Sequence, residues 1–133
     1  MLSTELCDTN VISELARPRP NRGVLEWAGG VTSIALSVVT LEEIFFGLAW
    51  RPNIRIRQWL DSFFDEYCEV IPVTAEIASR CGHLRGELRR EGHTLSQADS
   101  LIAATAEVYQ LTLVTRNVRD FRDLRIPLLN PFA

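Results

Sequence analysis

Apolar positions along the chain follow two spacings, one typical of short buried strands and one typical of amphipathic helices. Short apolar, β-branched runs predict strands, and apolar residues at helical spacing predict helices. Strands are expected at residues 2–8, 32–39, 69–73 and 111–115, and residues 126–129 are expected to form a last strand or an extended tail. Helices are expected at about 9–16, 21–29, 41 to the Arg51-Pro52 break, 54–66, 74–91 and 98–109.

Strands alternate with helices along much of the chain, which favours a parallel sheet covered by helices on both faces. The 133 residues contain no repeat, low-complexity tract or long linker, so we expect a single domain over residues 1–133. A chain of this length can bury a sizeable core without disulfides. In open parallel sheets, ligands bind beyond the carboxyl ends of the strands.

The amino-acid composition bears on where the protein is located and on whether its cysteines form disulfides or a zinc site. Hydrophobic residues make up 47% of the chain, yet no stretch reaches the roughly 18 apolar residues of a membrane span. The first residues lack the pattern of a signal peptide, so we expect a cytoplasmic protein that does not contact the membrane. Three cysteines without Cys-x-x-Cys spacing indicate neither a disulfide framework nor a zinc site.

The charged residues of the chain do not decide whether it binds nucleic acid. The formal net charge is −3, which is a poor overall signature for nucleic-acid binding. All 14 basic residues are arginines, whose planar guanidinium groups suit phosphate and carboxylate. An acidic protein can still bind RNA if its negative charge lies in a metal site that arginines surround.

Three carboxylates fall at the starts of predicted helices. Asp8 ends the first strand, Glu43 lies in the first turn after the second strand, and Asp99 opens the helix that follows Ser96. Each has an ordinary structural alternative. Asp8 can cap a helix, Thr40-x-x-Glu43 matches a capping box, and Ser96-x-x-Asp99 is a weaker version of that pattern.

The joint placement of these carboxylates favours a metal site. If the three helices start at one edge of the sheet, the acidic groups converge and repel one another. A hard divalent cation such as Mg²⁺ relieves that repulsion and prefers oxygen ligands. Gly47 lies one turn beyond Glu43 and leaves a bare patch where a ligand can approach.

A fourth group follows the strand at 111–115. Asn117 offers an amide oxygen and Asp120 a carboxylate, while Thr115 and Arg116 are candidates to orient or hold phosphate. The alternative is a simple turn, in which Asn117 starts a short helix that Phe121 anchors to the core.

Five segments together resemble the motifs of PIN-domain proteins, in the order of that family. They are Asp8–Glu14, Val39–Ile44, Ala98–Ala106 and Leu113–Asn117, followed by an ending, Leu129–Phe132, that is similar to the tail of VapC and FitB-like toxins. The resemblance covers essentially the whole chain. Asp-Thr-Asn alone is a weak signal, whereas the ordered set is strong.

The resemblance implies a three-layer α/β/α fold with a central parallel sheet of about four or five strands. It also implies a metal-dependent ribonuclease whose products carry a 3′-hydroxyl and a 5′-phosphate. The acidic positions of the family fall on Asp8, Glu43 and Asp99, with Glu42 a weaker alternative to Glu43. We expect these three to bind Mg²⁺, with Mn²⁺ as a substitute.

The fourth family position is a departure, because some members carry an aspartate where this chain has Asn117. Asp120 lies slightly later and is a candidate metal ligand. Either residue could complete the catalytic group, and the number of metal ions stays open.

The resemblance further implies a toxin of a bacterial toxin–antitoxin pair, which forms a homodimer and binds a cognate antitoxin. Such an antitoxin binds operator DNA through its other end, and one of its arginines suits the acidic pocket. We expect Leu15, Trp27, Phe46 and Trp50 as candidate antitoxin contacts, although burial in the core is the alternative for each.

Two other functions remain open from the sequence. One is a non-catalytic module that acts as a co-repressor in a DNA-bound complex, and the other is a different Mg²⁺-dependent phosphotransfer or DNA-cleaving enzyme. No Gly-rich phosphate loop is present, which disfavours nucleotide triphosphate chemistry. Candidate RNA backbone contacts are Arg85, Arg89, Arg90, Arg116 and Arg119, although a solvated helix face explains the first three equally well.

Overall fold

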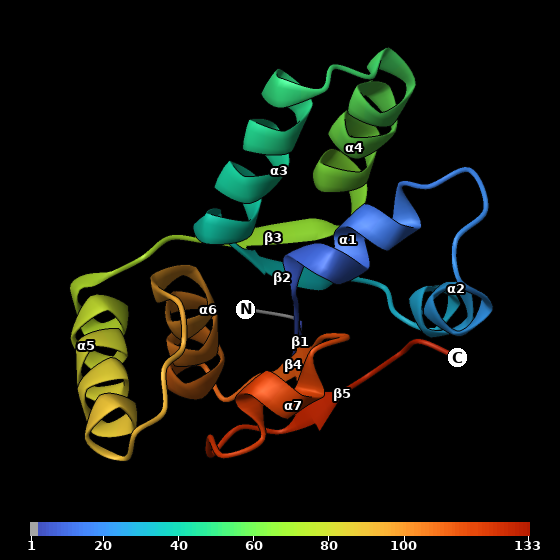
Figure 1. Cartoon of the computed structure of the whole chain (residues 1–133). Helices are drawn as coiled ribbons and strands as arrows, with labels where there is room; N and C mark the ends of the chain where they lie inside the picture. Colours follow the sequence, from blue (N-terminus) through green and yellow to red (C-terminus); the bar gives the residue numbers. More distant parts are fainter. Residues whose placement is uncertain (1–2) are drawn as a thin grey trace.

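A parallel five-stranded sheet forms the centre of the molecule in the computed structural model, which describes residues 3–133. Its strands lie in the order β3-β2-β1-β4-β5 (Figure 1). Their bounds are β1 (Glu5–Cys7), β2 (Ile34–Ser37), β3 (Cys68–Ile71), β4 (Thr112–Val114) and β5 (Leu128–Leu129). The strands occur where the sequence predicts them but are shorter, and Leu2 of the first predicted strand lies outside the described residues.

Helices occupy the segments between and beside the strands. Their bounds are α1 (Thr9–Leu15), α2 (Arg22–Gly29), α3 (Val38–Trp50), α4 (Ile54–Tyr67), α5 (Ala75–Arg90), α6 (Gln97–Val108) and α7 (Val118–Phe121). Within the described residues, no helix is long and apolar enough to cross a membrane.

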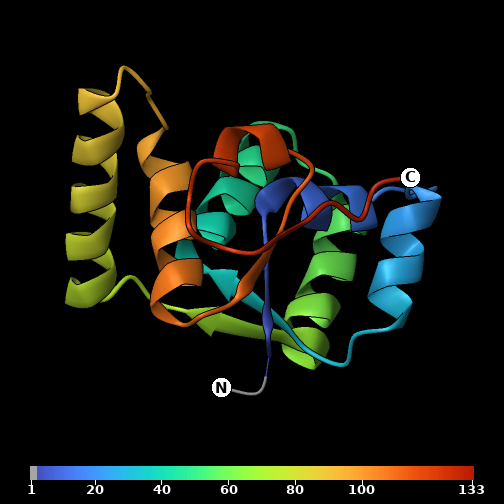
Figure 2. The same cartoon turned by 90° about the horizontal axis from the view of Figure 1, so that it is seen from below.

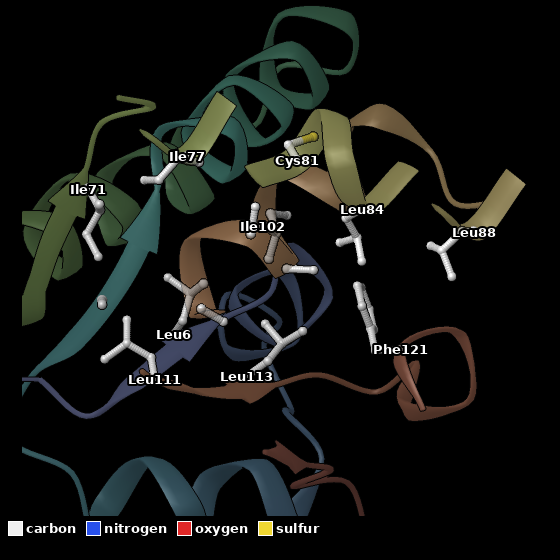
Figure 3. Packing of buried hydrophobic residues seen from close by; sticks show 14 residues of the cluster. Leu6, Ile71, Ile77, Cys81, Leu84, Leu88, Ile102, Leu111, Leu113 and Phe121 are labelled. Carbon is white, nitrogen blue, oxygen red and sulfur yellow. The ribbon is translucent and has the colours of Figure 1, made fainter. Parts of the chain in front are cut away.

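Side chains of each central strand alternate between the two faces of the sheet, because the strand period is two residues. Leu6 of β1 and Leu113 of β4 belong to the core cluster that α5 and α6 cover. Figure 3 shows this cluster, to which α7 adds the buried ring of Phe121. Phe121 thus anchors the segment after β4 to the core, as the alternative interpretation of this segment as a turn expects.

The next residue on each strand points to the opposite face. Cys7 of β1 and Val114 of β4 pack in a second cluster with side chains of α1, α2, α3 and α4. Figure 2 shows α5 and α6 on one side of the sheet and α2 and α4 on the other. The prediction of a three-layer α/β/α fold around a parallel sheet is confirmed.

The strand order reverses at β1, which places a binding crevice at its carboxyl end. The chain builds β2 and β3 on one side of β1, and β4 and β5 on the other. The amide of Asp8 donates to the carbonyl of Val114 at 2.9 Å, so the ends of β1 and β4 lie side by side. Ligands of open α/β sheets bind at such a reversal point.

Helix α3 begins earlier than the sequence predicts. Strand β2 ends at Ser37, whose hydroxyl accepts from the amide of Val39 at 3.1 Å and caps the helix. Thr40 therefore lies inside the helix, and the proposed capping box of Thr40 and Glu43 is wrong. Glu43 consequently lies in the second turn, where its carboxylate is free to contact another element.

Two of the four expected antitoxin contacts do not lie on a free surface. Leu15 is only 7% exposed, because it lies on the inner side of α1 and packs in the core. Trp27 is half-buried, and its indole donates to Glu5 at 3.0 Å. Phe46 and Trp50 are 62% and 68% exposed, so these two remain available to a partner.

Candidate functional site

Asp8 is the most constrained carboxylate of the candidate site. It follows β1 directly, is only 4% exposed and caps α1 by accepting from the amide of Thr9 at 2.7 Å. Its second oxygen accepts from the hydroxyl of Thr115 at 2.8 Å and from the side-chain nitrogen Nδ2 of Asn10 at 3.1 Å. The carboxylate is therefore both the expected helix cap and a buried, oriented charge.

Glu43 reaches the same place from α3. The hydroxyl of Thr9 donates to the Glu43 carboxylate at 2.6 Å and lies 3.2 Å from the hydroxyl of Thr40. Glu43 is half-buried, whereas the neighbouring Glu42 is exposed. Thr9 thus links the residue after Asp8 to Glu43, and the structure brings Glu43 rather than Glu42 to the site.

Asp99 enters from the first turn of α6. The hydroxyl of Ser96 accepts from the amide of Asp99 at 3.1 Å, so Ser96 caps this helix as the sequence predicts. Burial raises the pKa of the Asp99 carboxyl, and the negative charge of Asp8 raises it further. A side-chain hydrogen bond between Ser96 and the carboxyl lowers the pKa, while Glu43 and Asp120 add smaller contributions that raise it.

The Asp99 carboxyl is thus under the electrostatic influence of three other carboxylates, those of Asp8 before α1, Glu43 in α3 and Asp120 in α7. Concentrated negative charge of this kind is unfavourable unless protons or a cation compensate it. In the part of the chain that the structure describes, no three acidic, histidine or cysteine side chains enclose a position for an ion. The oxygen donors fit a hard divalent cation that keeps several waters, rather than one held in a closed protein cage.

The segment after β4 supplies the remaining predicted residues. Asn117 precedes α7 without a side-chain capping bond, and both it and Asp120 are exposed. Arg116 is also exposed, with its guanidinium 4.7 Å from the ring centroid of Phe132. Thr115 differs from the expectation of a phosphate contact, because its side chain is fully buried and its hydroxyl donates to Asp8.

Asn10 is a residue of the site to which the sequence analysis assigned no role. Besides donating to Asp8, its side-chain oxygen accepts from the amide of Arg116 at 3.1 Å. Asn10 therefore holds the turn after β4 against the turn after β1. Its place directly after Asp-Thr was the only sequence signal, since the partner Arg116 lies 106 positions away.

Cysteine chemistry does not belong to this site. Cys7 and Cys81 are buried free thiols, and Cys68 is a half-buried one. Burial raises the pKa of Cys7 and raises that of Cys68 to about 12. The nucleophilic thiolate forms of both are therefore suppressed at neutral pH.

Comparison with known proteins agrees with this arrangement. The PIN domain family model matches residues 6–127. Toxin FitB of Neisseria gonorrhoeae is 30% identical over 135 residues, covering 96% of this chain and 97% of FitB. VapC ribonuclease Y4jK of Sinorhizobium fredii is 30% identical over 133 residues, covering 94% of this chain and 95% of the relative.

Solved structures of toxin–antitoxin complexes also match this chain over nearly its whole length. The crystal structure of FitAcB from Neisseria gonorrhoeae matches with a TM-score of 0.82 and 30% identity, covering 96% of this chain and 97% of the other. DNA-bound VapBC from Salmonella typhimurium matches with a TM-score of 0.87 and 25% identity, covering 98% and 99% of the two chains. PIN-domain ribonucleases are, as a group, metal-dependent. With its family motifs in order and its carboxylates at the reversal point of the sheet, this chain belongs to the PIN-domain family.

Proposed function

We propose that this protein is a Mg²⁺-dependent endoribonuclease and the toxin of a bacterial toxin–antitoxin pair. The observation that carries the proposal is the arrangement of hydrogen bonds after β1, where Thr115 and Asn10 orient the Asp8 carboxylate and Thr9 donates to Glu43. The raised pKa of Asp99, to which Asp8, Glu43 and Asp120 contribute, supports the inclusion of Asp99 and Asp120. Relatives named as VapC ribonucleases, and one named as a tRNA(fMet)-specific endonuclease, support the choice of RNA as substrate.

In this proposal Asp8, Glu43 and Asp99 hold the metal, and Asp120 or Asn117 completes the group. When bound, a divalent cation activates water and neutralises charge that develops on the phosphate. Thr115 and Asn10 keep the Asp8 carboxylate in one orientation, and Thr9 does the same for Glu43. The exposed Arg116 contacts the phosphate backbone of the RNA.

Cleavage of a mixed RNA pool tests the proposal. Purified protein without antitoxin is incubated with RNA in Mg²⁺ or in EDTA, alongside Asp8→Asn, Asp99→Asn and the control Asp65→Asn. Asp65 is an exposed carboxylate of α4, so the control makes the same chemical change away from the site. We expect cleavage only in Mg²⁺, at least a hundredfold loss in both site variants, and full activity in the control.

Other outcomes separate the alternatives. Full activity in Asp8→Asn would remove this residue from the metal site. A folded wild-type protein that binds neither Mn²⁺ nor Mg²⁺ and cleaves no RNA would favour a non-catalytic co-repressor. Cleavage of a DNA pool at an equal or greater rate would make the protein a deoxyribonuclease instead.

The partner that we propose is an antitoxin segment with apolar residues beside a basic one. A groove of about 420 Å³ runs among α1, α3 and α4, and its lining includes Thr9 and Glu43 of the site as well as apolar side chains. An arginine or lysine next to an apolar segment would place its charge by these carboxylates. Structures of FitAB with an IR36 DNA fragment and of VapBC2 with promoter DNA support operator binding through the antitoxin.

Co-expression with the neighbouring open reading frame tests the partner. We expect a stable complex in which the nuclease is inhibited, and we expect the toxin alone to be a homodimer by light scattering. A protein that purifies free of that partner, and whose cleavage the partner does not reduce, would contradict the antitoxin proposal. A monomer would contradict only the predicted homodimer.

A further inference from the structure

We propose that Arg116, Arg119 and Arg122 form a subsite for an RNA phosphate beside the phosphate that is cleaved. The inference rests on the proposed ribonuclease function and adds the direction in which the RNA leaves the carboxylate cluster. The three arginines line a hollow of about 420 Å³ on the turn after β4, together with Asn117, Val118 and Asp120.

The charged side chains that line this hollow favour a bound anion. The hollow has three arginines and a single aspartate, although the formal net charge of the chain is −3. Ion pairs within the described residues use other basic side chains, so these guanidinium groups have no carboxylate partner there. A planar guanidinium can donate two parallel hydrogen bonds to one phosphate.

Arg116 is held in place before any ligand arrives. Its amide donates to Asn10, and its guanidinium stacks over the ring of Phe132 at 4.7 Å. The backbone contact and the cation–π contact both restrict the residue. Less conformational freedom is therefore lost when Arg116 binds a phosphate than for a freely moving surface arginine.

The hollow directly adjoins the carboxylate cluster. It begins one residue after Thr115, whose hydroxyl donates to Asp8 and accepts from the amide of Asn117. A strand of RNA presents negative phosphates at regular spacing, and the carboxylates repel those that no cation neutralises. An arginine-lined hollow beside them offers the next phosphate a favourable position, so we assign its occupant as a phosphodiester of single-stranded RNA.

RNA binding without cleavage tests the subsite. A labelled, short, mixed-sequence single-stranded RNA is titrated in EDTA by fluorescence anisotropy at several salt concentrations. The triple variant Arg116→Gln/Arg119→Gln/Arg122→Gln is compared with Arg19→Gln/Arg22→Gln/Arg55→Gln. The control changes the same charge at exposed arginines of the α1–α2 loop, α2 and α4, and circular dichroism checks that both variants are folded.

We expect the subsite variant to bind at least tenfold more weakly than wild type, while the control binds as wild type. The logarithm of the association constant for RNA falls linearly with the logarithm of the salt concentration. Each lost phosphate contact should make this slope less steep by about 0.7 for single-stranded nucleic acid. In Mg²⁺, KM should rise more than kcat falls, because the contact is present in both ground and transition states.

Three results would overturn the subsite. Wild-type affinity and slope in the subsite variant would remove it and leave the ribonuclease proposal intact. Unchanged RNA binding with weakened antitoxin binding would assign the hollow to the protein partner. A wild-type protein that neither binds nor cleaves RNA would refute the proposed function and the subsite together.

Discussion

Asp8 shows how one carboxylate is oriented by groups from two distant parts of the chain. Thr9 and Asn10 follow it directly, whereas Thr115 reaches it from the end of β4. Each donor fixes one oxygen of a nearly buried anion, which would otherwise carry a large desolvation cost. Groups that orient ligands in this way commonly contribute 10–100-fold to metal affinity or activity in metal sites.

Replacing Thr115 by valine should test this orientation. Valine has nearly the same shape but removes the hydroxyl that donates to Asp8 and accepts from Asn117. We expect Mn²⁺ affinity to fall roughly 10–100-fold and the free energy of unfolding to fall by about 1–3 kcal/mol. Calorimetric titration and denaturant unfolding measure the two, with Thr115→Ser as a control that keeps the hydroxyl. Unchanged Mn²⁺ affinity in the valine variant would contradict the positioning role.

Asp99 leads to a prediction about pH. Its pKa is raised in the metal-free fold, first by burial and then by Asp8, so folding favours the protonated form. That contribution to stability is complete below the ordinary aspartate pKa and is lost as pH rises through the raised value. Asp99→Asn, which is neutral at every pH, should therefore raise the Tm in EDTA at neutral pH.

The gain should disappear at a pH below the ordinary pKa of aspartate, because the wild-type carboxyl is then neutral too. Thermal unfolding in EDTA at the two pH values measures it, with Asp65→Asn as the control. A lower Tm of Asp99→Asn at neutral pH would show that the negative charge of Asp99 stabilises the metal-free protein.

Helix α3 contributes both to the carboxylate site and to an exposed apolar surface. Its first turns bring Glu43 to the carboxylate cluster, while its second half exposes Phe46 and Trp50. Gly47 follows Phe46 directly and lines the groove together with Glu43. A Cβ added at Gly47 would meet no atom within 4 Å, so the groove has room at this point.

Two substitutions at Gly47 distinguish an effect on antitoxin binding in the groove from an effect on the stability of α3. Gly47→Ala should raise the free energy of unfolding by roughly 0.5–1 kcal/mol, since alanine favours helix and nothing obstructs its methyl group. Gly47→Phe should fill the groove and weaken antitoxin binding at least tenfold. Surface plasmon resonance with the co-purified antitoxin measures the affinities, and Gly47→Ala is the size control. Equal affinities in both variants would place the antitoxin elsewhere.

At the scale of the whole molecule, the site depends on how the sheet is assembled. Strands β1 and β4 are adjacent although more than a hundred residues separate them, and α6 precedes β4 in the chain. Asp8, Glu43 and Asp99 therefore belong to segments that only the complete fold assembles. A cation that binds all three should stabilise the entire fold, because the unfolded chain cannot hold them together.

Mg²⁺ should accordingly raise the Tm of the wild-type protein in a concentration-dependent way. At a hundred times the dissociation constant, the expected stabilisation is about 2.7 kcal/mol. The Asp8→Asn variant should gain much less, and NaCl at matched ionic strength should not reproduce the effect. Differential scanning calorimetry measures the shift, and equal shifts in wild type and Asp8→Asn would contradict Mg²⁺ binding at this site.

The sequence by itself determined the order of the elements and the candidate carboxylates. Strand and helix periods are local properties, and an acidic residue after a strand is visible without any knowledge of the fold. For this reason the α/β architecture and the cap at Ser96 agree with prediction, and the anchoring by Phe121 agrees with the alternative interpretation of its segment. The position of Asp99 relative to Asp8 did not follow from the strands, because Asp99 lies in a helix that comes after α5 rather than after a strand.

Only the tertiary structure decided the partners of these residues. Helix α3 is capped by Ser37 rather than by Thr40, so the Glu43 carboxylate is not part of a capping box and accepts from Thr9. The buried role of Thr115 likewise depends on the pairing of β1 with β4. Contacts between distant segments are set by strand register and helix packing, and a shift of one residue would turn each side chain to the opposite face.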